Sequence, residues 1–160
     1  MTMRVGNGID FHALENNRPF YIGGVLITEE FGPIAHSDGD VLLHAICDAL
    51  LGAAGLNDIG YYFPNDDQKF KNIPSLQLLA LTHQYISEKK YKIVNIDSSV
   101  CLEKPKIRQF IDEMKLNISA VVNISTECIS IKATTTEKLG FIGRGEGVMA
   151  IASCLLTLKN

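Results

Sequence analysis

Two histidines and an aspartate stand at spacings that suit a metal site. Asp10 and His12 lie two residues apart at the end of a strand-like segment, so their side chains point to the same face. His44 lies in an amphipathic helical segment with Asp40 and Asp48 four residues to either side, which places these three side chains on one helix face. One carboxylate and two imidazoles from these segments form a three-ligand set that leaves zinc an open fourth position. An open position is typical of a zinc ion that grips or polarises a substrate.

Each of these residues also has an ordinary structural interpretation. A lone histidine on a helix is more often a satisfied core or surface residue than a ligand, and the Asp-x-His pattern occurs often by chance. The interpretation of His44 as a ligand therefore depends on ligands elsewhere in the chain, and Asp10 and His12 supply them. The three residues together predict a metal site that none of them predicts alone.

A second stretch, residues 132–147, places hydroxyls, charges and glycines directly after a predicted strand. Thr134, Thr135 and Thr136 are followed by Glu137 and then by a Gly-Arg-Gly-Glu-Gly run. Hydroxyls and backbone N–H groups at a strand-to-helix junction suit phosphate oxygens, and a carboxylate there can hold Mg²⁺ or Mn²⁺ on a diphosphate. The Walker and Rossmann glycine patterns are absent. For any one of these residues alone, a helix cap with a glycine turn is the favoured alternative.

Residues 55–74 are rich in Gly, Pro, Asn and Asp and are predicted to form a long loop. A loop of about 20 residues inside a compact domain is usually functional or disordered. The aromatic residues in this stretch argue against disorder. We expect a substrate loop with Asp58, Asp66 and Asp67 as its polar groups, and a solvated acidic loop is the alternative.

Strands and helices alternate along the chain to position these groups. The pattern predicts strands over 3–9, 91–103, 128–133 and 147–158, and a hairpin over 19–28 that turns at Gly23-Gly24. A loop is predicted over 29–35. Three helices are predicted: one that starts after Ser37 and ends near Gly52 to Gly55, one over 75–90, and one from Pro105. This order predicts an α/β fold, an α+β sandwich in which a mixed β-sheet has helices packed on one face. We expect one domain over residues 1–160.

Local signals add details about helix starts and about close packing. Ser37 is predicted as the N-cap of the first long helix, with Asp40 completing a capping-box-like pair, and Ser75 as the cap of the second. Gly6 and Gly8 in the first strand indicate that another group approaches the backbone closely.

Composition excludes several classes of partner. The chain has 46% hydrophobic and 21% charged residues, which is ordinary for a soluble globular protein, and its net charge of −3 gives no electrostatic case for nucleic acid or an anionic membrane. No apolar run approaches the roughly 20 residues of a membrane span, and no signal peptide precedes the first strand, so we expect a cytoplasmic location. Four cysteines at long spacings, without a Cys-x-x-Cys pair, are expected to be free buried thiols.

Several stretches together resemble one known family. They are Gly8-Ile-Asp-Phe-His12, His-Ser-Asp-Gly-Asp-Val-Leu-Leu-His-Ala-Ile-Cys-Asp over 36–48, Asp58-Ile-Gly60, Phe63-Pro64, Pro105-Lys106 and residues 132–147. In order and spacing, over nearly the whole chain, they resemble the 2-C-methyl-D-erythritol 2,4-cyclodiphosphate synthases of the non-mevalonate isoprenoid pathway. The resemblance implies an enzyme, a phosphorus–oxygen lyase that converts 4-diphosphocytidyl-2-C-methyl-D-erythritol 2-phosphate to the cyclic diphosphate and releases CMP.

In such enzymes the 2-phosphate attacks the β-phosphorus, a step that needs placement and charge neutralisation more than covalent chemistry. The resemblance implies two kinds of metal ion: Zn²⁺, or another divalent transition metal, on Asp10, His12 and His44, and Mg²⁺ or Mn²⁺ on Glu137. It gives His36 and Thr135 the catalytic role of steadying the transition state. The substrate-binding residues that it implies are Asp10, His12, His36, Ser37, Asp58, Ile59, Gly60, Phe63, Asp67, Leu102, Glu103, Lys104, Pro105, Lys106, Ile107, Thr134, Thr135, Thr136, Glu137, Phe141 and Arg144.

Within that set, residues 102–107 with the threonines would form the cytidine pocket, and Asp58 and Gly60 would meet the methylerythritol hydroxyls. The resemblance also implies a homotrimer with each active site between two subunits. Near Phe141 and Arg144, on the three-fold axis, it implies a cavity that can hold an isoprenoid diphosphate.

Three positions depart from the family pattern. Asn7 stands where the family often has His, Ile9 where it often has Phe, and Asn65 where it often has an acid. Ile9 would line the axial cavity, so ligand binding there stays an open question. Two other functions are weighed against the synthase: a non-catalytic trimer that senses isoprenoid diphosphates, and a zinc-dependent phosphohydrolase that uses water. The retained metal ligands argue against a pure binder, and His36 is the one evident base for a hydrolase.

Overall fold

The fold is organised around one five-stranded sheet, which a computed structural model describes over residues 3–64 and 66–159. The strand order is β4-β1-β7-β5-β6. β5 and β6 run parallel and the other neighbours run antiparallel, so the predicted mixed sheet is confirmed. The bounds are β1 (Met3–Asn16), β4 (Phe31–Pro33), β5 (Tyr91–Cys101), β6 (Ile129–Thr134) and β7 (Gly147–Leu158). A separate two-stranded hairpin joins β2 (Phe20–Ile22) to β3 (Val25–Thr28), as the Gly23-Gly24 turn predicts.

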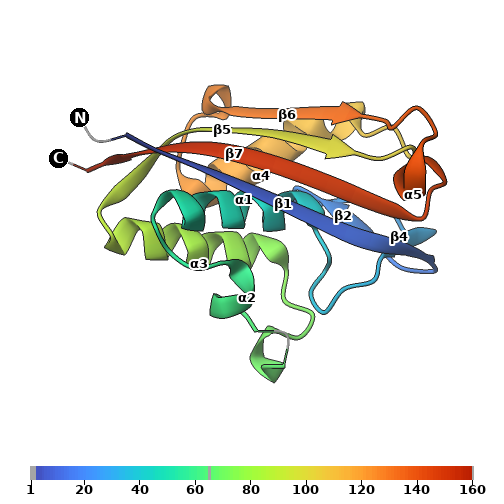
Figure 1. Ribbon diagram of the computed structural model, residues 1–160, viewed down its shortest axis with the longest axis horizontal. Coiled ribbons are helices and arrows are strands. Elements are labelled where there is room, and N and C mark those ends of the chain that lie inside the picture. The colour runs from blue at the N-terminus through green and yellow to red at the C-terminus, as the bar shows by residue number, and fades with distance from the viewer. Residues whose placement is uncertain (1–2, 65, 160) are drawn as a thin grey trace.

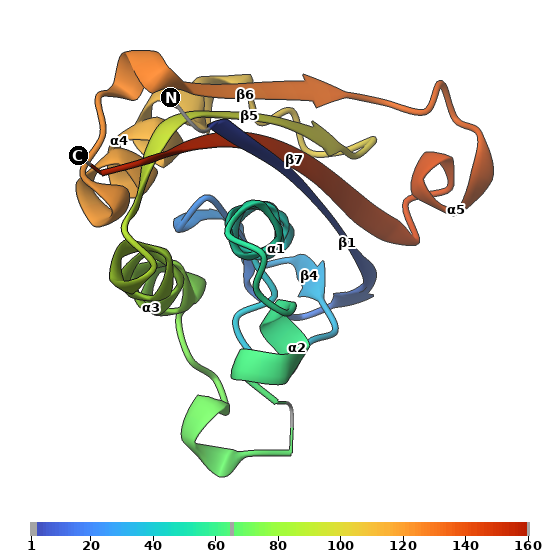
Figure 2. The ribbon, with the colours of Figure 1, turned by 60° about the vertical axis from the view of Figure 1, so that its left-hand side comes forward.

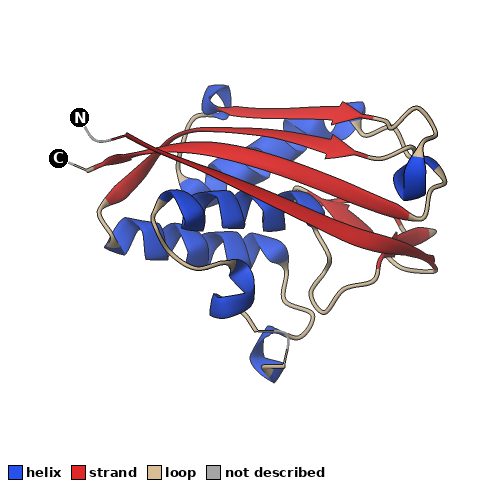
Figure 3. Cartoon of the chain, viewed as in Figure 1, coloured by secondary structure: helices blue, strands red, loops and turns tan. Residues whose placement is uncertain are grey.

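Three long helices lie on one face of this sheet (Figures 1 and 2), as the sequence predicts. They are α1 (Val41–Ala53), α3 (Ser75–Glu88) and α4 (Ile111–Val122). The short elements are α2 (Ile59–Tyr62), α5 (Gly140–Gly143) and the 3-10 turns η1 (Gln68–Phe70), η2 (Arg108–Phe110) and η3 (Thr126–Cys128), which Figure 3 shows between the long elements. None of the helices described is long and apolar enough to cross a membrane.

Helix α1 is the centre of the core, between the sheet and α3. Its large apolar side chains are fully buried, and each such burial stabilises the fold by about 1.5–3 kcal/mol. They are Leu42, Leu43, Ile46, Leu50 and Leu51. A helix buried on nearly all sides cannot shift without opening the core, so a side chain on it has a fixed position relative to the sheet.

Strand β1 lies unusually close to α1. A Cβ atom at Gly6 would lie 2.0 Å from the Ala49 carbonyl oxygen, and one at Gly8 would lie 2.1 Å from the Ala45 carbonyl oxygen. Only glycine permits this approach of strand backbone to helix backbone. The close packing expected from the two glycines is confirmed, and β1 continues beyond the predicted end at residue 9 to Asn16.

The predicted starts of α1 and α4 are wrong; α3 begins at Ser75 as predicted, but its predicted cap is wrong. Asp40 caps α1 by accepting the Leu43 N–H, whereas the Ser37 hydroxyl lies near His44. Ser75 is the first residue of α3 rather than its cap, and its hydroxyl also contacts His44. Local capping rules fail here because both hydroxyls bond to other groups: Ser37 Oγ accepts the Gly39 N–H, Ser75 Oγ donates to Asp38, and both also contact the His44 ring. Helix α4 begins at Ile111, six residues after Pro105, where its residues Met114, Ile118 and Val122 start to pack into the core.

Two predicted loops contain short regular elements. The 29–35 segment includes β4, which pairs with the extended end of β1 through Leu14 and Pro33. The 55–74 segment includes α2 and η1, whose N-caps are Asp58 and Asp67. The four cysteines are free, as expected, with three of them buried and Cys128 half-buried, and burial raises the pKa of Cys47 to about 12.

The contact between β1 and α1 predicts the effect of two matched glycine substitutions. Gly8→Ala should destabilise the protein by about 1–3 kcal/mol, because the new methyl group overpacks the helix backbone. Gly52→Ala, on the exposed surface of α1, is the control, because a Cβ atom there would lie 4.0 Å from its nearest neighbour, the Asn7 carbonyl oxygen. This substitution should stabilise the helix by about 0.5–1 kcal/mol. Urea unfolding with linear extrapolation measures both. Equal stabilities of the two variants would contradict the close packing.

Candidate metal centre

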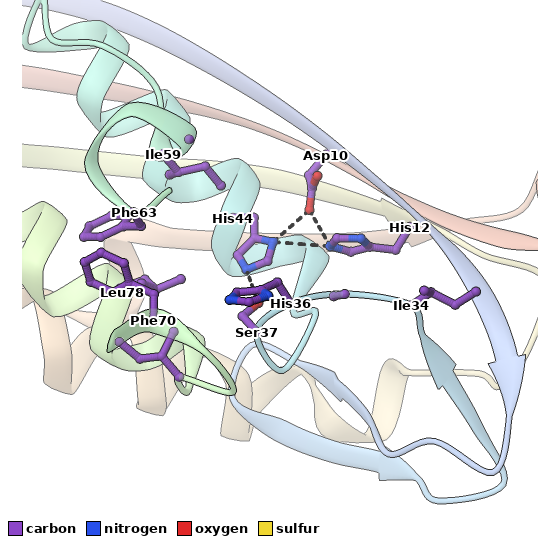
Figure 4. A pocket seen from close by; sticks show the side chains of 13 residues that line it. Asp10, His12, Ile34, His36, Ser37, His44, Ile59, Phe63, Phe70 and Leu78 are labelled. Atoms are coloured by element: carbon purple, nitrogen blue, oxygen red, sulfur yellow. Dashed lines mark hydrogen bonds and ion pairs between the residues drawn. The ribbon is translucent and has the colours of Figure 1, made fainter. Parts of the chain in front are cut away.

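The three predicted metal ligands meet where β1 crosses α1 (Figure 4). The Asp10 Oδ2 atom lies 3.0 Å from His12 Nε2 and 3.0 Å from His44 Nδ1. The two ring nitrogens are 3.3 Å apart. Among the described residues this is the one group of three or more His, Cys, Asp or Glu whose ligand atoms converge, all within 4.8 Å of one another. The strand places Asp10 and His12 on the face that looks toward α1, as their two-residue spacing predicts.

The donor set and its distances fit a zinc ion. Zinc takes nitrogen and carboxylate oxygen ligands at about 2.0–2.2 Å in a tetrahedron, so neighbouring ligand atoms lie about 3.3 Å apart. The three distances between Asp10, His12 and His44 are close to that value. Three protein ligands leave the fourth position of a tetrahedron open to a substrate oxygen.

The charges of the cluster also favour a cation. Burial raises the pKa of Asp10, but hydrogen bonds with His12 and His44 and the charges of these rings outweigh burial and hold that pKa well below its ordinary value. Burial lowers the pKa of His44, but its hydrogen bond to Asp10 and the nearby carboxylates raise it further, so the net shift is upward. The Asp10 carboxylate is therefore ionised over the neutral pH range, which is the form that binds a metal.

A cavity of about 430 Å³ opens over the three ligands. His36 and Ser37 lie on its wall beside His44 (Figure 4). The Nε2 atom of His36 is buried and has no hydrogen-bond partner among the described residues, so a ligand in the cavity could accept or donate there. The cavity's remaining lining is mostly apolar and comprises Ile34, Ala35, Ile59, Gly60, Phe63, Phe70, Ile73 and Leu78.

The carboxylates beside the cavity act mainly as anchors. Asp40 is fully buried and accepts hydrogen bonds from Gly24 N and Leu43 N, at 2.7 Å and 3.0 Å. Asp48 accepts a 2.8 Å hydrogen bond from Ile59 N and so holds the start of α2. Neither belongs to the candidate metal cluster. The predicted Asp40–His44–Asp48 face therefore contains one candidate ligand, His44, and two structural acceptors.

The predicted acidic loop makes only part of the cavity wall. Asp58 caps α2 by accepting the Tyr61 N–H at 2.9 Å and lines a neighbouring cavity of about 400 Å³ with Asn7, Ile9 and Asp48. Asp67 caps η1 through Lys69 N. Asp66 is exposed, and Asn65 lies outside the described residues.

Sequence analysis missed two residues that lie behind the candidate metal ligands. His44 Nε2 lies 2.9 Å from the hydroxyl of Ser75, which is fully buried and also hydrogen-bonds to Asp38. The only local signal for Ser75 was its place at a helix start, and an N-cap role accounts for a serine there without any metal site. Asp38 carried no signal of its own, because its contact with Ser75 spans 37 positions of the chain.

The second group of predicted residues lies elsewhere on the sheet. Thr134 ends β6 and residues 135–137 follow it. β6 is separated from β1 by β7 and β5, a lateral distance of about 14 Å at the usual strand spacing. None of residues 102–107 or 134–137 lines the cavity over the metal cluster. Within one chain, therefore, the metal cluster and the predicted phosphate- and cytidine-binding residues do not line the same cavity.

Glu103 organises this second group. Its carboxylate accepts hydrogen bonds from Thr136 N, Thr136 Oγ1 and Lys138 N at 3.0, 3.2 and 3.2 Å. These bonds hold a turn in which Glu137 and Lys138 both have left-handed backbones, with φ of 53° and 66°. The Thr135 hydroxyl donates to Glu137 at 2.9 Å in the same turn. The predicted hydroxyl and carboxylate of the phosphate-binding stretch are thus adjacent.

The residues predicted near a three-fold axis lie at the end of this stretch. The Phe141 ring packs 6.2 Å from Phe11, measured between ring centroids. The Arg144 guanidinium binds both carboxylate oxygens of Glu146 at 2.8 Å, and this pairing lowers the pKa of Glu146.

Glu103→Ala tests the support of the 135–138 turn. Without the carboxylate, the amide protons of Thr136 and Lys138 lose their acceptor, and we expect their hydrogen exchange to become faster. Exchange followed by NMR or mass spectrometry measures this, with Glu127→Ala, an exposed substitution on the same protein, as the control. Unchanged protection of both amides in Glu103→Ala would contradict the proposed anchor.

Comparison with known proteins identifies close relatives. The sequence profile of the YgbB family matches residues 3–157. Curated proteins named 2-C-methyl-D-erythritol 2,4-cyclodiphosphate synthase are similar over nearly their full length. The protein from Phocaeicola vulgatus is 50% identical over 156 residues, 98% of each chain. The protein from Clostridium botulinum strain Hall is 53% identical over 154 residues, 96% of this chain and 99% of the relative.

Solved structures share the fold. The bifunctional IspDF of Campylobacter jejuni matches 99% of this chain at 44% identity with a TM-score of 0.96, and this chain spans 43% of that longer protein. A Plasmodium falciparum IspF complex with CDP matches 99% of this chain and 97% of its own at 37% identity, with a TM-score of 0.87.

Proposed function

The chain belongs to the YgbB family, and from this premise we propose that it catalyses the cyclisation that gives its curated relatives their name. It converts 4-diphosphocytidyl-2-C-methyl-D-erythritol 2-phosphate to 2-C-methyl-D-erythritol 2,4-cyclodiphosphate and releases CMP, in isoprenoid biosynthesis. The observation that carries this proposal is the Asp10–His12–His44 cluster beneath a cavity, in a chain 50% identical to such a synthase over 98% of its length. We assign the activity to one domain, residues 1–160. The proposed enzyme class is phosphorus–oxygen lyase, and the proposed location is the cytoplasm.

In this reaction an oxygen of the 2-phosphate forms a bond to the β-phosphorus. The bond from the β-phosphorus to the oxygen that bridges it to the α-phosphorus breaks, and that oxygen leaves with CMP. Asp10 Oδ2, His12 Nε2 and His44 Nδ1 would hold Zn²⁺, which supplies Lewis-acid neutralisation of phosphate charge when bound. Glu137 is the proposed ligand of Mg²⁺ or Mn²⁺ on the diphosphate.

The remaining residues of the cavity orient the substrate and exclude water. The buried His36 Nε2, which lacks a partner among the described residues, and the Ser37 hydroxyl can hydrogen-bond phosphate oxygens. Ile59, Gly60 and Phe63 shape the wall on the side of α2. A largely apolar wall disfavours attack by water, and this supports cyclisation over the hydrolysis that a zinc phosphohydrolase would perform.

We propose that a second copy of the chain completes each site, in a homotrimer. Residues 102–107 and Thr134–Glu137 would form the cytidine and Mg²⁺ half of the site, and they lie three strands from the metal cluster of their own chain. The sheet face opposite the helices exposes Val5, Ile9 and Phe11, an apolar surface that suits burial between subunits. The CDP in the Plasmodium falciparum complex supports a nucleotide ligand for such a site.

We also propose a ligand for the axial cavity. Phe141 and Arg144 would face it, but Arg144 is already paired with Glu146. Ile9 is half exposed on the same sheet face. The converging metal ligands do not serve a protein that only senses isoprenoid diphosphates, so the catalytic function is preferred.

Phosphorus NMR tests the reaction directly. With the cytidylylated substrate, Zn²⁺ and Mg²⁺, we expect two coupled resonances of a cyclic diphosphate to appear together with free CMP. His44→Ala should abolish turnover and zinc binding while the fold and the trimer persist, because folding rests on the apolar faces of α1 rather than on His44. CMP with a linear product would instead establish hydrolysis, and full activity of His44→Ala without bound zinc would refute the metal site.

Mixing two inactive variants tests whether subunits share a site. His44→Ala and Glu137→Ala damage opposite halves, so a site between unlike subunits can contain both intact halves. After unfolding and joint refolding in equal amounts, about a quarter of the sites in a random trimer should be intact, and activity should recover to about that fraction. Mixing without subunit exchange is the control. Mixed trimers without recovered activity would place both halves of the site in one chain.

A further inference from the structure

We propose that Ser75 and Asp38 are positioning residues of the metal centre, which fix the ring nitrogen that His44 presents to the metal. The inference rests on the proposed zinc site and extends it by two residues that neither the motif spacing nor the cluster of ligands identifies. Its basis is a buried chain of hydrogen bonds that runs from Asp38 through Ser75 to the imidazole.

The chain of bonds is closed to water at its centre. Ser75 is 0% exposed and His44 is 6% exposed, and the Ser75 hydroxyl lies 2.9 Å from His44 Nε2. On its other side Ser75 is held twice by Asp38. Its N–H donates to Asp38 Oδ2 at 2.8 Å, and its hydroxyl donates to Asp38 Oδ1. Two bonds to one carboxylate leave the serine little freedom to rotate.

A count of protons assigns the direction of each bond. A serine hydroxyl has one proton, and an ionised carboxylate can only accept, so the proton of Ser75 points to Asp38. The Ser75 oxygen then has only lone pairs for His44, and the ring must donate its Nε2–H. Without a metal, Nδ1 holds a proton for its bond to Asp10. When zinc replaces that proton, the neutral imidazole carries its one N–H at Nε2, and the Nδ1 lone pair is available to the metal. That atom is the one that faces Asp10 and His12, at 3.0 Å and 3.3 Å.

A second hydroxyl competes for the same ring proton. Ser37 Oγ lies 3.2 Å from His44 Nε2 and also accepts the Gly39 N–H. Ser37 lines the cavity, where a substrate phosphate can engage it, whereas Ser75 is fully buried and does not line the cavity. The Ser75 bond therefore preserves the orientation of His44 when substrate binding redirects Ser37.

The same residues tie the metal ligand to the segment that carries His36 and Ser37. The Asp38 N–H donates to the Ile73 carbonyl at 3.4 Å, and the Asn72 N–H donates to the His36 carbonyl at 3.0 Å. Asp38 thus pins the segment 36–40 against the residues just before α3. Outer hydrogen bonds of this kind typically change metal affinity about 10- to 100-fold when they are removed.

Ser75→Ala removes the hydroxyl with no other change of shape. We expect zinc affinity, measured by chelator competition on the full-length protein, to fall about 10- to 100-fold, and the visible absorption of the Co²⁺-substituted protein to change in position or intensity. In the zinc-loaded protein, ¹⁵N NMR should show a His44 Nε2–H protected from exchange, and Ser75→Ala should remove that protection. Thr82→Val is the matched control, since it removes an equally buried hydroxyl from the same helix and should leave all three readings unchanged.

Wild-type zinc affinity and an unchanged Co²⁺ spectrum in folded Ser75→Ala would overturn the proposal. Asp38→Asn provides a second variant, because its amide no longer dictates the direction of the Ser75 proton, and it should weaken zinc binding in the same direction. If Ser75→Ala does not fold, the NMR measurement on the unaltered protein tests the proposal. A His44 Nε2–H that exchanges freely there would refute the hydrogen bond to Ser75. A wild-type protein that binds no zinc would instead contradict the proposed function itself.

Discussion

The close contact between the backbones of β1 and α1 is the constraint on which the metal centre depends. Gly6 and Gly8 let the strand lie directly against the carbonyls of Ala45 and Ala49. Asp10 and His12 continue the same strand face, and His44 lies one residue before Ala45, so the backbone contact sets the distances among the three ligands. Side chains at the two glycine positions would separate the elements and with them the ligands.

The carboxylates around α1 differ in what compensates their burial. Burial raises the pKa of Asp40 and of Asp48, and backbone N–H donors offset only part of that effect. Asp10 has two imidazoles as partners instead, and its pKa is lowered despite burial. A carboxylate held by backbone donors is a structural acceptor, whereas one facing two ring nitrogens is prepared for a cation. This contrast separates the metal ligand from its acidic neighbours.

Local patterns in the sequence predicted the long strands, the hairpin and the convergence of Asp10, His12 and His44, because alternation, glycine turns and two-residue spacing act over a few residues. They failed where a distant group decides. The hydroxyls of Ser37 and Ser75 satisfy the capping rule by type, yet both lie against His44, 7 and 31 positions away. The short helices in the 55–74 segment are a different case, because their caps Asp58 and Asp67 are local but were interpreted as polar groups of a substrate loop. No window of sequence contains the contact that places Asp38 behind a metal ligand.

The separation of the two groups of proposed site residues links the proposed assembly to the proposed activity. The metal cluster lies at β1, whereas Thr135 and Glu137 follow β6 beyond two intervening strands. A packed sheet does not bring these two strands together, so the proposed substrate, which needs both groups, is proposed to bind between two chains. In the proposed trimer, the apolar face that exposes Val5 and Ile9 becomes the contact that brings them together. Burial of that face would then stabilise the assembly and the complete site at once, and a lone chain would hold zinc without completing the reaction.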